Sequence, residues 1–231
     1  MKNIKNQILF LLLCLLSHSA WALQEVQAEI GKEPHIEVYL IQRQLLLKHG
    51  NEVIKQYPIG VARSRDFMTP PGSYMVLVKD TNPGWSNPYN PKIKIPPGPN
   101  NPLGTRWIGF HKIGKQAFGI HGTNDPSSVG KFVSHGCIRM KIPDAEDLFE
   151  RIAIGTPVQV IYNRIEIKNI DGDIAITINE DPYQVLPLNL EELKKSILSS
   201  FPQAVINETS LQNMIQAPPY GQTRLVGYLP K

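Results

Sequence analysis

Short apolar stretches separated by turn residues follow one another from residue 36 to residue 78, which is the pattern of β-strands joined by tight turns. Ile36, Val38 and Leu40 alternate with other residues, so their side chains share one face of an extended chain. His49-Gly50-Asn51 is a turn signal between two such stretches. Further strands are expected at 57–61, 74–78, 107–110 and 118–120. The sequence therefore predicts a mainly β fold.

Residues 81–105 interrupt this pattern because they contain seven prolines. Proline lacks a backbone donor and fixes φ, so the segment cannot be a central strand or a helix. Long ordered loops in compact domains are uncommon unless they form a lid or a binding surface, and Trp85 and Tyr89 suit that use. The alternative is an irregular surface connection whose aromatic residues cover the core, and the sequence does not choose between the two.

A helix and a closing strand are expected after residue 142. Asp144 is the predicted N-cap, Leu148 and Ile152 have helical spacing, and Gly155 marks the end. Residues 157–162 are rich in valine and isoleucine and predict a strand.

The more polar residues 163–231 predict a small α+β C-terminal extension of unknown role. Asp171-Gly172 indicates a hairpin, and Asn189 with Glu192 forms a capping box that predicts a helix start.

The first 22 residues are typical of a cleavable signal peptide. Lys2 and Lys5 precede the apolar stretch 8–16, and Ala20-Trp21-Ala22 is a small-x-small cleavage site. The stretch is shorter than the roughly 20 apolar residues of a membrane span, so the mature chain is expected in the periplasm without a transmembrane anchor. Residues 23–34 are a polar lead-in to a domain at 35–162.

Processing would remove Cys14 and leave Cys137 as the single cysteine, which excludes an intramolecular disulfide in the mature protein. Stability must then come from an apolar core, for which the 42% hydrophobic content is sufficient. The whole chain has 24 basic and 20 acidic residues, and this small excess argues against a nucleic-acid partner.

Two short motifs carry the expected chemistry, His121-Gly122-Thr123 and Ser134-His135-Gly136-Cys137-Ile138-Arg139. The thiolate is the reactive form of cysteine, and positive neighbours such as His135 and Arg139 are expected to lower the pKa of Cys137 toward neutrality. A glycine-rich turn can expose the sulfur and direct backbone N–H groups at one point, which is how an oxyanion hole forms. The sequence therefore predicts nucleophilic catalysis by Cys137.

His121 is the expected general base, because the end of a strand and a loop sixteen residues later can meet. The group that orients its imidazole is left open between Asn124, Asp125 and a backbone carbonyl near Gly122. A structural buried thiol and a zinc site made by His121, His135 and Cys137 are the rival interpretations.

These motifs, together with 57–60, the Thr69-Pro70-Pro71-Gly72 turn and 97–104, resemble the L,D-transpeptidase family, whose catalytic module is the YkuD-type domain. The resemblance covers residues 35–162 and is closest to the subgroup of Gram-negative envelopes. It implies a mixed β-sandwich with one or two short helices, and no metal or cofactor.

The resemblance also implies a reaction. Cys137 would attack the carbonyl of the third residue of a peptidoglycan tetrapeptide stem and release D-alanine, with His121 as the base. His135, Gly136, Ser134 and Gly122 would form or support the oxyanion site. Arg139 would bind the substrate carboxylate, although it could equally be a salt-bridged residue at the edge of the core. Trp85 and Tyr89 are candidates for substrate binding because of the proline-rich segment that contains them, not because of the resemblance.

The acyl acceptor is not determined by the sequence. An amine of another stem peptide or a lysine of a wall-linked lipoprotein would make the protein a transpeptidase, and water would make it a carboxypeptidase. A peptidoglycan-binding protein with an inert thiol is the non-enzymatic alternative.

Overall fold

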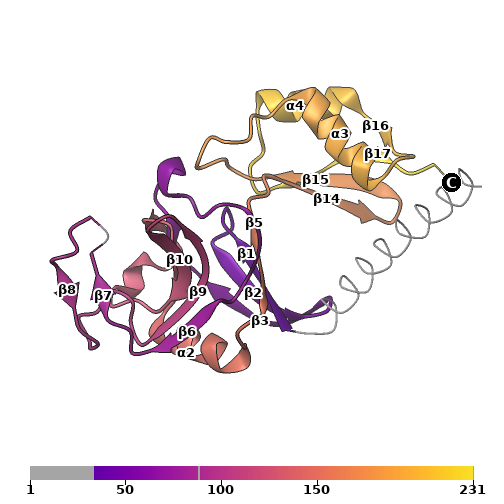
Figure 1. The fold of residues 1–231 in the computed structure, drawn as a ribbon. Coiled ribbons are helices and arrows are strands. Elements are labelled where there is room, and N and C mark those ends of the chain that lie inside the picture. The colour runs from indigo at the N-terminus through magenta and orange to yellow at the C-terminus, as the bar shows by residue number, and fades with distance from the viewer. Residues whose placement is uncertain (1–33, 88, 231) are drawn as a thin grey trace, which may run out of the picture.

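The computed structural model describes residues 34–87 and 89–230. The expected signal peptide, Cys14 and residues 23–33 of the lead-in lie outside these ranges. The described chain forms two sheets with their own core, followed by a C-terminal extension that has a separate sheet and core (Figure 1). None of the helices in the described ranges has the length and apolarity that crossing a membrane requires.

The first sheet has five strands in the order β3-β2-β1-β13-β5. Antiparallel pairs join β1 to β2, β2 to β3 and β13 to β5, whereas β1 and β13 are parallel. The strands are β1 (Pro34–Tyr39), β2 (Gln44–His49), β3 (Glu52–Pro58), β5 (Gly72–Met75) and β13 (Pro157–Ile161). The alternation predicted for 36–40 is confirmed, because Ile36, Val38 and Leu40 are fully buried.

The second sheet has four strands in the order β12-β10-β9-β6, with β10 parallel to β12. The strands are β6 (Val78–Thr81), β9 (Arg106–Ile113), β10 (Gln116–His121) and β12 (Ile138–Arg139). Ile108, Ile120 and Ile138 point into the core that this sheet shares with the first one. The mixed β-sandwich predicted from the sequence is therefore confirmed.

Two of the strand predictions were wrong in detail. The stretch 74–78 does not form one strand, because the chain leaves the first sheet after β5 and enters the second at β6. The stretch 57–61 also divides, since β3 ends at Pro58 and β4 (Val61–Ala62) pairs in parallel with β11 (Phe132–Ser134). An apolar stretch can continue through such a change of partner strand, so the sequence pattern does not reveal the change.

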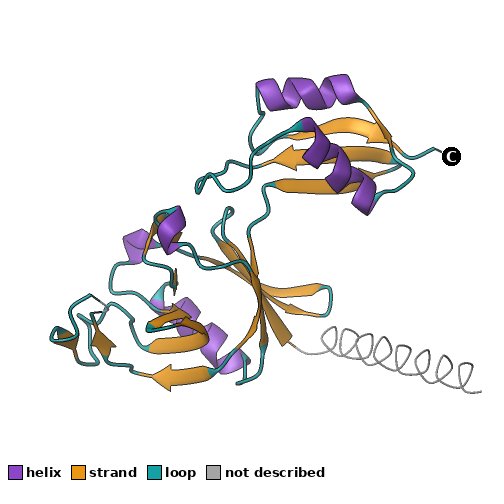
Figure 2. Ribbon diagram, turned by 45° about the horizontal axis from the view of Figure 1, so that its top comes forward, coloured by secondary structure: helices purple, strands orange, loops and turns teal. Residues whose placement is uncertain are grey.

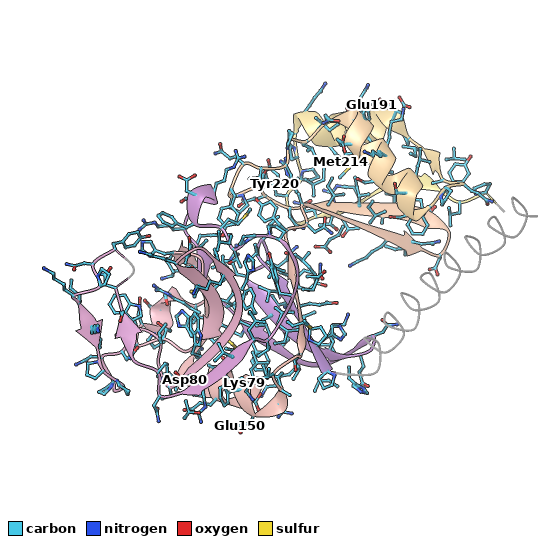
Figure 3. The ribbon with its side chains drawn as sticks, viewed as in Figure 1. Lys79, Asp80, Glu150, Glu191, Met214 and Tyr220 are labelled. Atoms are coloured by element: carbon cyan, nitrogen blue, oxygen red, sulfur yellow. The ribbon has the colours of Figure 1, made fainter. Side chains whose placement is uncertain are left out.

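Helix α2 (Ile142–Arg151) packs on β9 and β10. Its N-cap is Lys141 rather than the predicted Asp144. Asp144 lies in the first turn, where its carboxylate interacts favourably with the positive end of the helix dipole. The helix ends at Arg151, before Gly155. Lys79 Nζ donates to the carbonyls of Phe149 and Ile152 at 2.7 and 2.6 Å, and Figure 3 shows Lys79 beside this end of the helix.

In the proline-rich segment the described residues form a small hairpin of β7 (Trp85–Ser86) and β8 (Lys94–Ile95). Neither a helix nor a central strand is present among these described residues, in agreement with the prediction from the prolines. Two 3-10 turns, at Arg65–Phe67 and Pro126–Ser128, complete this part of the chain.

The C-terminal extension is the α+β unit predicted from the sequence. Its sheet has the order β14-β15-β17-β16, and helices α3 and α4 cover one face of it (Figure 2). Asp171-Gly172 forms the expected hairpin turn, and the Asn189 side chain accepts from Glu192 N as the capping box requires. The elements are β14 (Ile165–Ile170), β15 (Asp173–Ile178), α3 (Leu190–Ser200), β16 (Val205–Ile206), α4 (Glu208–Gln216) and β17 (Thr223–Tyr228).

Candidate active site

The second sheet places the two motifs next to each other. β10 ends at His121, and its parallel pairing with β12 sets Ile120 beside Ile138 and His121 beside Arg139. Cys137 immediately precedes β12 and is therefore level with Gly119 on β10. Because side chains alternate between the faces of a sheet, His121 lies on the face opposite the buried Ile120, and Arg139 lies on the face opposite the buried Ile138. Cys137 Sγ lies 3.6 Å from the carbonyl oxygen of Ala117, which is also on β10.

The His121 imidazole is held by a backbone carbonyl. Its Nδ1 lies 2.5 Å from Gly122 O, so this nitrogen carries the proton and Nε2 is left as the acceptor. The backbone alternative from the sequence is therefore the one observed. Asn124 instead donates to Asn100 O, and Asp125 accepts from Ser127 at the start of a 3-10 turn.

Trp107 forms one wall of the His121 site. Its indole is nearly parallel to the imidazole, with ring centroids 5.8 Å apart and planes at 25°. The indole lies across two glycines, because a Cβ on Gly119 would be 2.6 Å from Trp107 Cη2 and one on Gly109 would be 2.9 Å from Trp107 Nε1. Sequence reasoning missed this residue, although two glycines inside predicted strands signal a close approach by another group.

The loop before Cys137 is braced by polar contacts from within and from the Thr69 turn. Ser134 is buried and its Oγ accepts from Gly136 N at 3.1 Å, while Thr69 Oγ1 donates to Gly136 O at 2.5 Å. Gly136 has a φ of +116°, and a Cβ there would lie 2.9 Å from both Phe118 Cε1 and Phe67 O. Only glycine fits this position. The side-chain role of Thr69 was not predicted.

The expected depression of the thiol pKa was wrong. Burial raises the pKa of Cys137 to about 11. This effect is larger than those of the hydrogen bond with the Gly119 backbone and of the Arg139 charge, which both lower the pKa. Burial also lowers the pKa of His121 to about 4, with Arg139 adding to the effect and the Gly122 hydrogen bond opposing it. The resting pair at neutral pH is therefore a neutral thiol and a neutral imidazole.

His135 is an exposed aromatic contact rather than a source of positive charge. Burial and the charges of Arg63 and Arg139 lower its pKa. Its ring meets Phe67 edge-on at 4.9 Å and Tyr89 edge-on at 5.7 Å. Tyr89 thus reaches the loop 134–137 from the proline-rich segment. Trp85 instead lies in the small hairpin, opposite Ile95.

Arg139 forms no ion pair within 34–87 and 89–230, so the salt-bridged alternative has no support there. The same ranges contain no group of three His, Cys, Asp or Glu side chains placed to hold a metal ion.

Comparison with known protein families identifies the family of the first domain. A family model described as the L,D-transpeptidase catalytic domain, of the YkuD type, matches residues 33–160. The chain therefore belongs to the L,D-transpeptidase family.

The relatives differ in length from this chain. It is 41% identical over 131 residues to the L,D-transpeptidase YqjB of Bacillus subtilis, covering 55% of this chain and 71% of that protein. It is 36% identical to YkuD of the same organism over 54% of this chain and 65% of the relative. It is 29% identical to the L,D-transpeptidase YcfS of Escherichia coli over 64% of this chain and about half, 52%, of the relative. A crystal structure of an Enterococcus faecium L,D-transpeptidase has a TM-score of 0.47 at 22% identity, over 56% of this chain and 50% of that one.

Proposed function

We propose that the protein is a periplasmic cysteine L,D-transpeptidase acting on peptidoglycan tetrapeptide stems. The observation that carries the proposal is the pairing of β10 with β12, because β10 ends at His121 and Cys137 is the residue immediately before β12. Family membership and the fixed tautomer of His121 support it. The periplasmic location rests on the signal-like residues 1–22.

In the first half-reaction Cys137 Sγ attacks the carbonyl carbon of the third stem residue while its proton passes to His121 Nε2. Burial raises the pKa of Cys137 and lowers the pKa of His121, so a separated thiolate–imidazolium pair is disfavoured in the resting site. Transfer must therefore accompany formation of the C–S bond rather than precede it. The C–N bond to D-alanine then breaks, and the imidazolium returns the proton to the departing amine.

The developing oxyanion needs backbone donors near Cys137. Gly136 N already donates to Ser134 Oγ, so it maintains the shape of the loop. The Cys137 N–H is the remaining donor of this turn closest to the reacting atom, and we assign the oxyanion to it.

In the second half-reaction an amine attacks the thioester and gives a proton to His121, the C–S bond breaks, and the imidazolium returns the proton to the departing sulfur of Cys137. A second stem peptide or a lipoprotein lysine can supply the amine. Arg139, which lacks an ion-pair partner in the described chain, is suited to a carboxylate of the donor stem, and Tyr89 to its peptide backbone.

The test is incubation of the chain from residue 23 onward with purified tetrapeptide stems, followed by mass spectrometry. Tripeptide together with cross-linked dimer is expected, and Cys137→Ala should abolish both. Tripeptide alone would identify a carboxypeptidase. A carbapenem should add stoichiometrically to Cys137 in the intact protein, and unmodified protein together with undiminished D-alanine release by Cys137→Ala would remove the assignment.

A further inference from the structure

A side chain from the C-terminal extension is buried in the core of the catalytic domain. Tyr183 is 3% exposed and belongs to the apolar cluster between the first two sheets, not to the cluster beneath α3 and α4. Its hydroxyl donates to Ala62 O at 2.7 Å, and its ring meets Phe132 edge-on at 5.7 Å. The extension thus contributes directly to the packing of the domain that carries Cys137.

Two of the residues that Tyr183 contacts, Ala62 and Phe132, belong to strands that support the loop 134–137. Ala62 lies in β4 and Phe132 in β11, and the parallel pairing of these strands sets Ser134 beside Ala62. Arg63 N also donates to Ser134 O at 3.0 Å. Ser134 in turn accepts from Gly136 N, next to the nucleophile. A continuous set of contacts therefore links the Tyr183 hydroxyl to the turn at Cys137.

The loop 181–186 has a fixed shape that presents Tyr183. The Asp181 carboxylate accepts from Val185 N at 3.2 Å, from Leu186 N at 2.8 Å and from the Tyr162 hydroxyl. Burial opposes ionisation, yet these hydrogen bonds hold the pKa of Asp181 below its ordinary value, so the acceptor is charged. The Tyr162 ring stacks on Tyr183 with centroids 5.4 Å apart. Such a preorganised loop restricts the positions that Tyr183 can take.

We infer that Tyr183 is a positioning residue for the nucleophile, and that the C-terminal extension is thereby part of the active centre. The inference rests on the proposed function of Cys137. Removing the hydroxyl leaves the buried Ala62 carbonyl without its donor, which the structure accommodates by shifting β4 and β11. A displacement of about 1 Å at a reacting group can lower a rate by up to about 100-fold.

Tyr183→Phe in the full mature chain tests this, because it keeps the ring and its packing. We expect kcat for D-alanine release to fall about tenfold with KM changed less than about twofold. Amide hydrogen exchange of residues 132–137 should become faster. The matched control is Tyr57→Phe, which removes a hydroxyl of another buried tyrosine whose partner is Asp147 near the middle of α2.

The comparison of the two variants decides the inference. If Tyr183→Phe and Tyr57→Phe have the same kcat and the same exchange over 132–137, Tyr183 does not position the loop. If the wild-type chain releases no D-alanine, the proposed function fails, but the exchange data still test whether Tyr183 positions the loop 134–137. Faster exchange of residues 132–137 in Tyr183→Phe alone supports this role, and equal rates in the two variants overturn it.

Discussion

The resting state of the Cys137 thiol can be measured by its alkylation rate as a function of pH. Iodoacetamide reacts with the thiolate, and burial raises the pKa of Cys137 from about 9 to about 11. Below pH 9 the thiolate fraction is then about 100-fold lower than for an unperturbed thiol, and it increases about tenfold with each pH unit. We therefore expect log k to increase with a slope near 1 from pH 6 to pH 10, without a plateau.

Two variants separate the causes of this behaviour. Arg139→Gln removes a positive charge that favours the thiolate, so the pKa of Cys137 should increase further and alkylation should slow. His121→Gln should leave alkylation at pH 7 nearly unchanged, because a neutral imidazole does not stabilise the thiolate, while D-alanine release falls at least about 100-fold. A plateau in log k between pH 5 and pH 9 in the wild type would refute the reasoning, since it would show a thiolate–imidazolium pair at rest.

Three further predictions concern stability and packing. The pKa of His121 is 6.5 in the unfolded chain and about 4 in the folded chain, so about 3 kcal/mol of the free energy of unfolding should be lost as the pH falls from 6.5 to 4. The urea concentration at the unfolding midpoint should therefore change less over this pH range in His121→Gln than in the wild type. Gly119→Ala should destabilise the fold by about 1–3 kcal/mol, and Trp107→Ala should relieve part of that cost in a double-mutant cycle; strict additivity would contradict the contact. Thr69→Val should leave the Gly136 carbonyl unpaired and lower kcat more than KM, whereas an unchanged kcat would show that the hydrogen bond does not hold the loop.

The local patterns in the sequence predicted most of the secondary structure correctly. The alternation at Ile36, Val38 and Leu40 places those side chains in the core, and the capping box at Asn189 begins α3. These features depend on residues that are close in the chain. The prediction failed at 74–78, where the chain changes sheets, because a continuous apolar stretch carries no information about its partner strand.

The sequence by itself was sufficient to propose Cys137 and His121 as the reacting residues, since they lie in two short motifs with the residue types that thiol acyl transfer needs. Tertiary structure alone decided their protonation, because burial outweighs the neighbouring positive charge and leaves both groups neutral. It also decided that Trp107 lies against the imidazole and that Tyr183 reaches Ala62, 121 residues earlier in the chain. Desolvation and contacts between distant residues arise only when the chain is packed, so no local pattern could predict them.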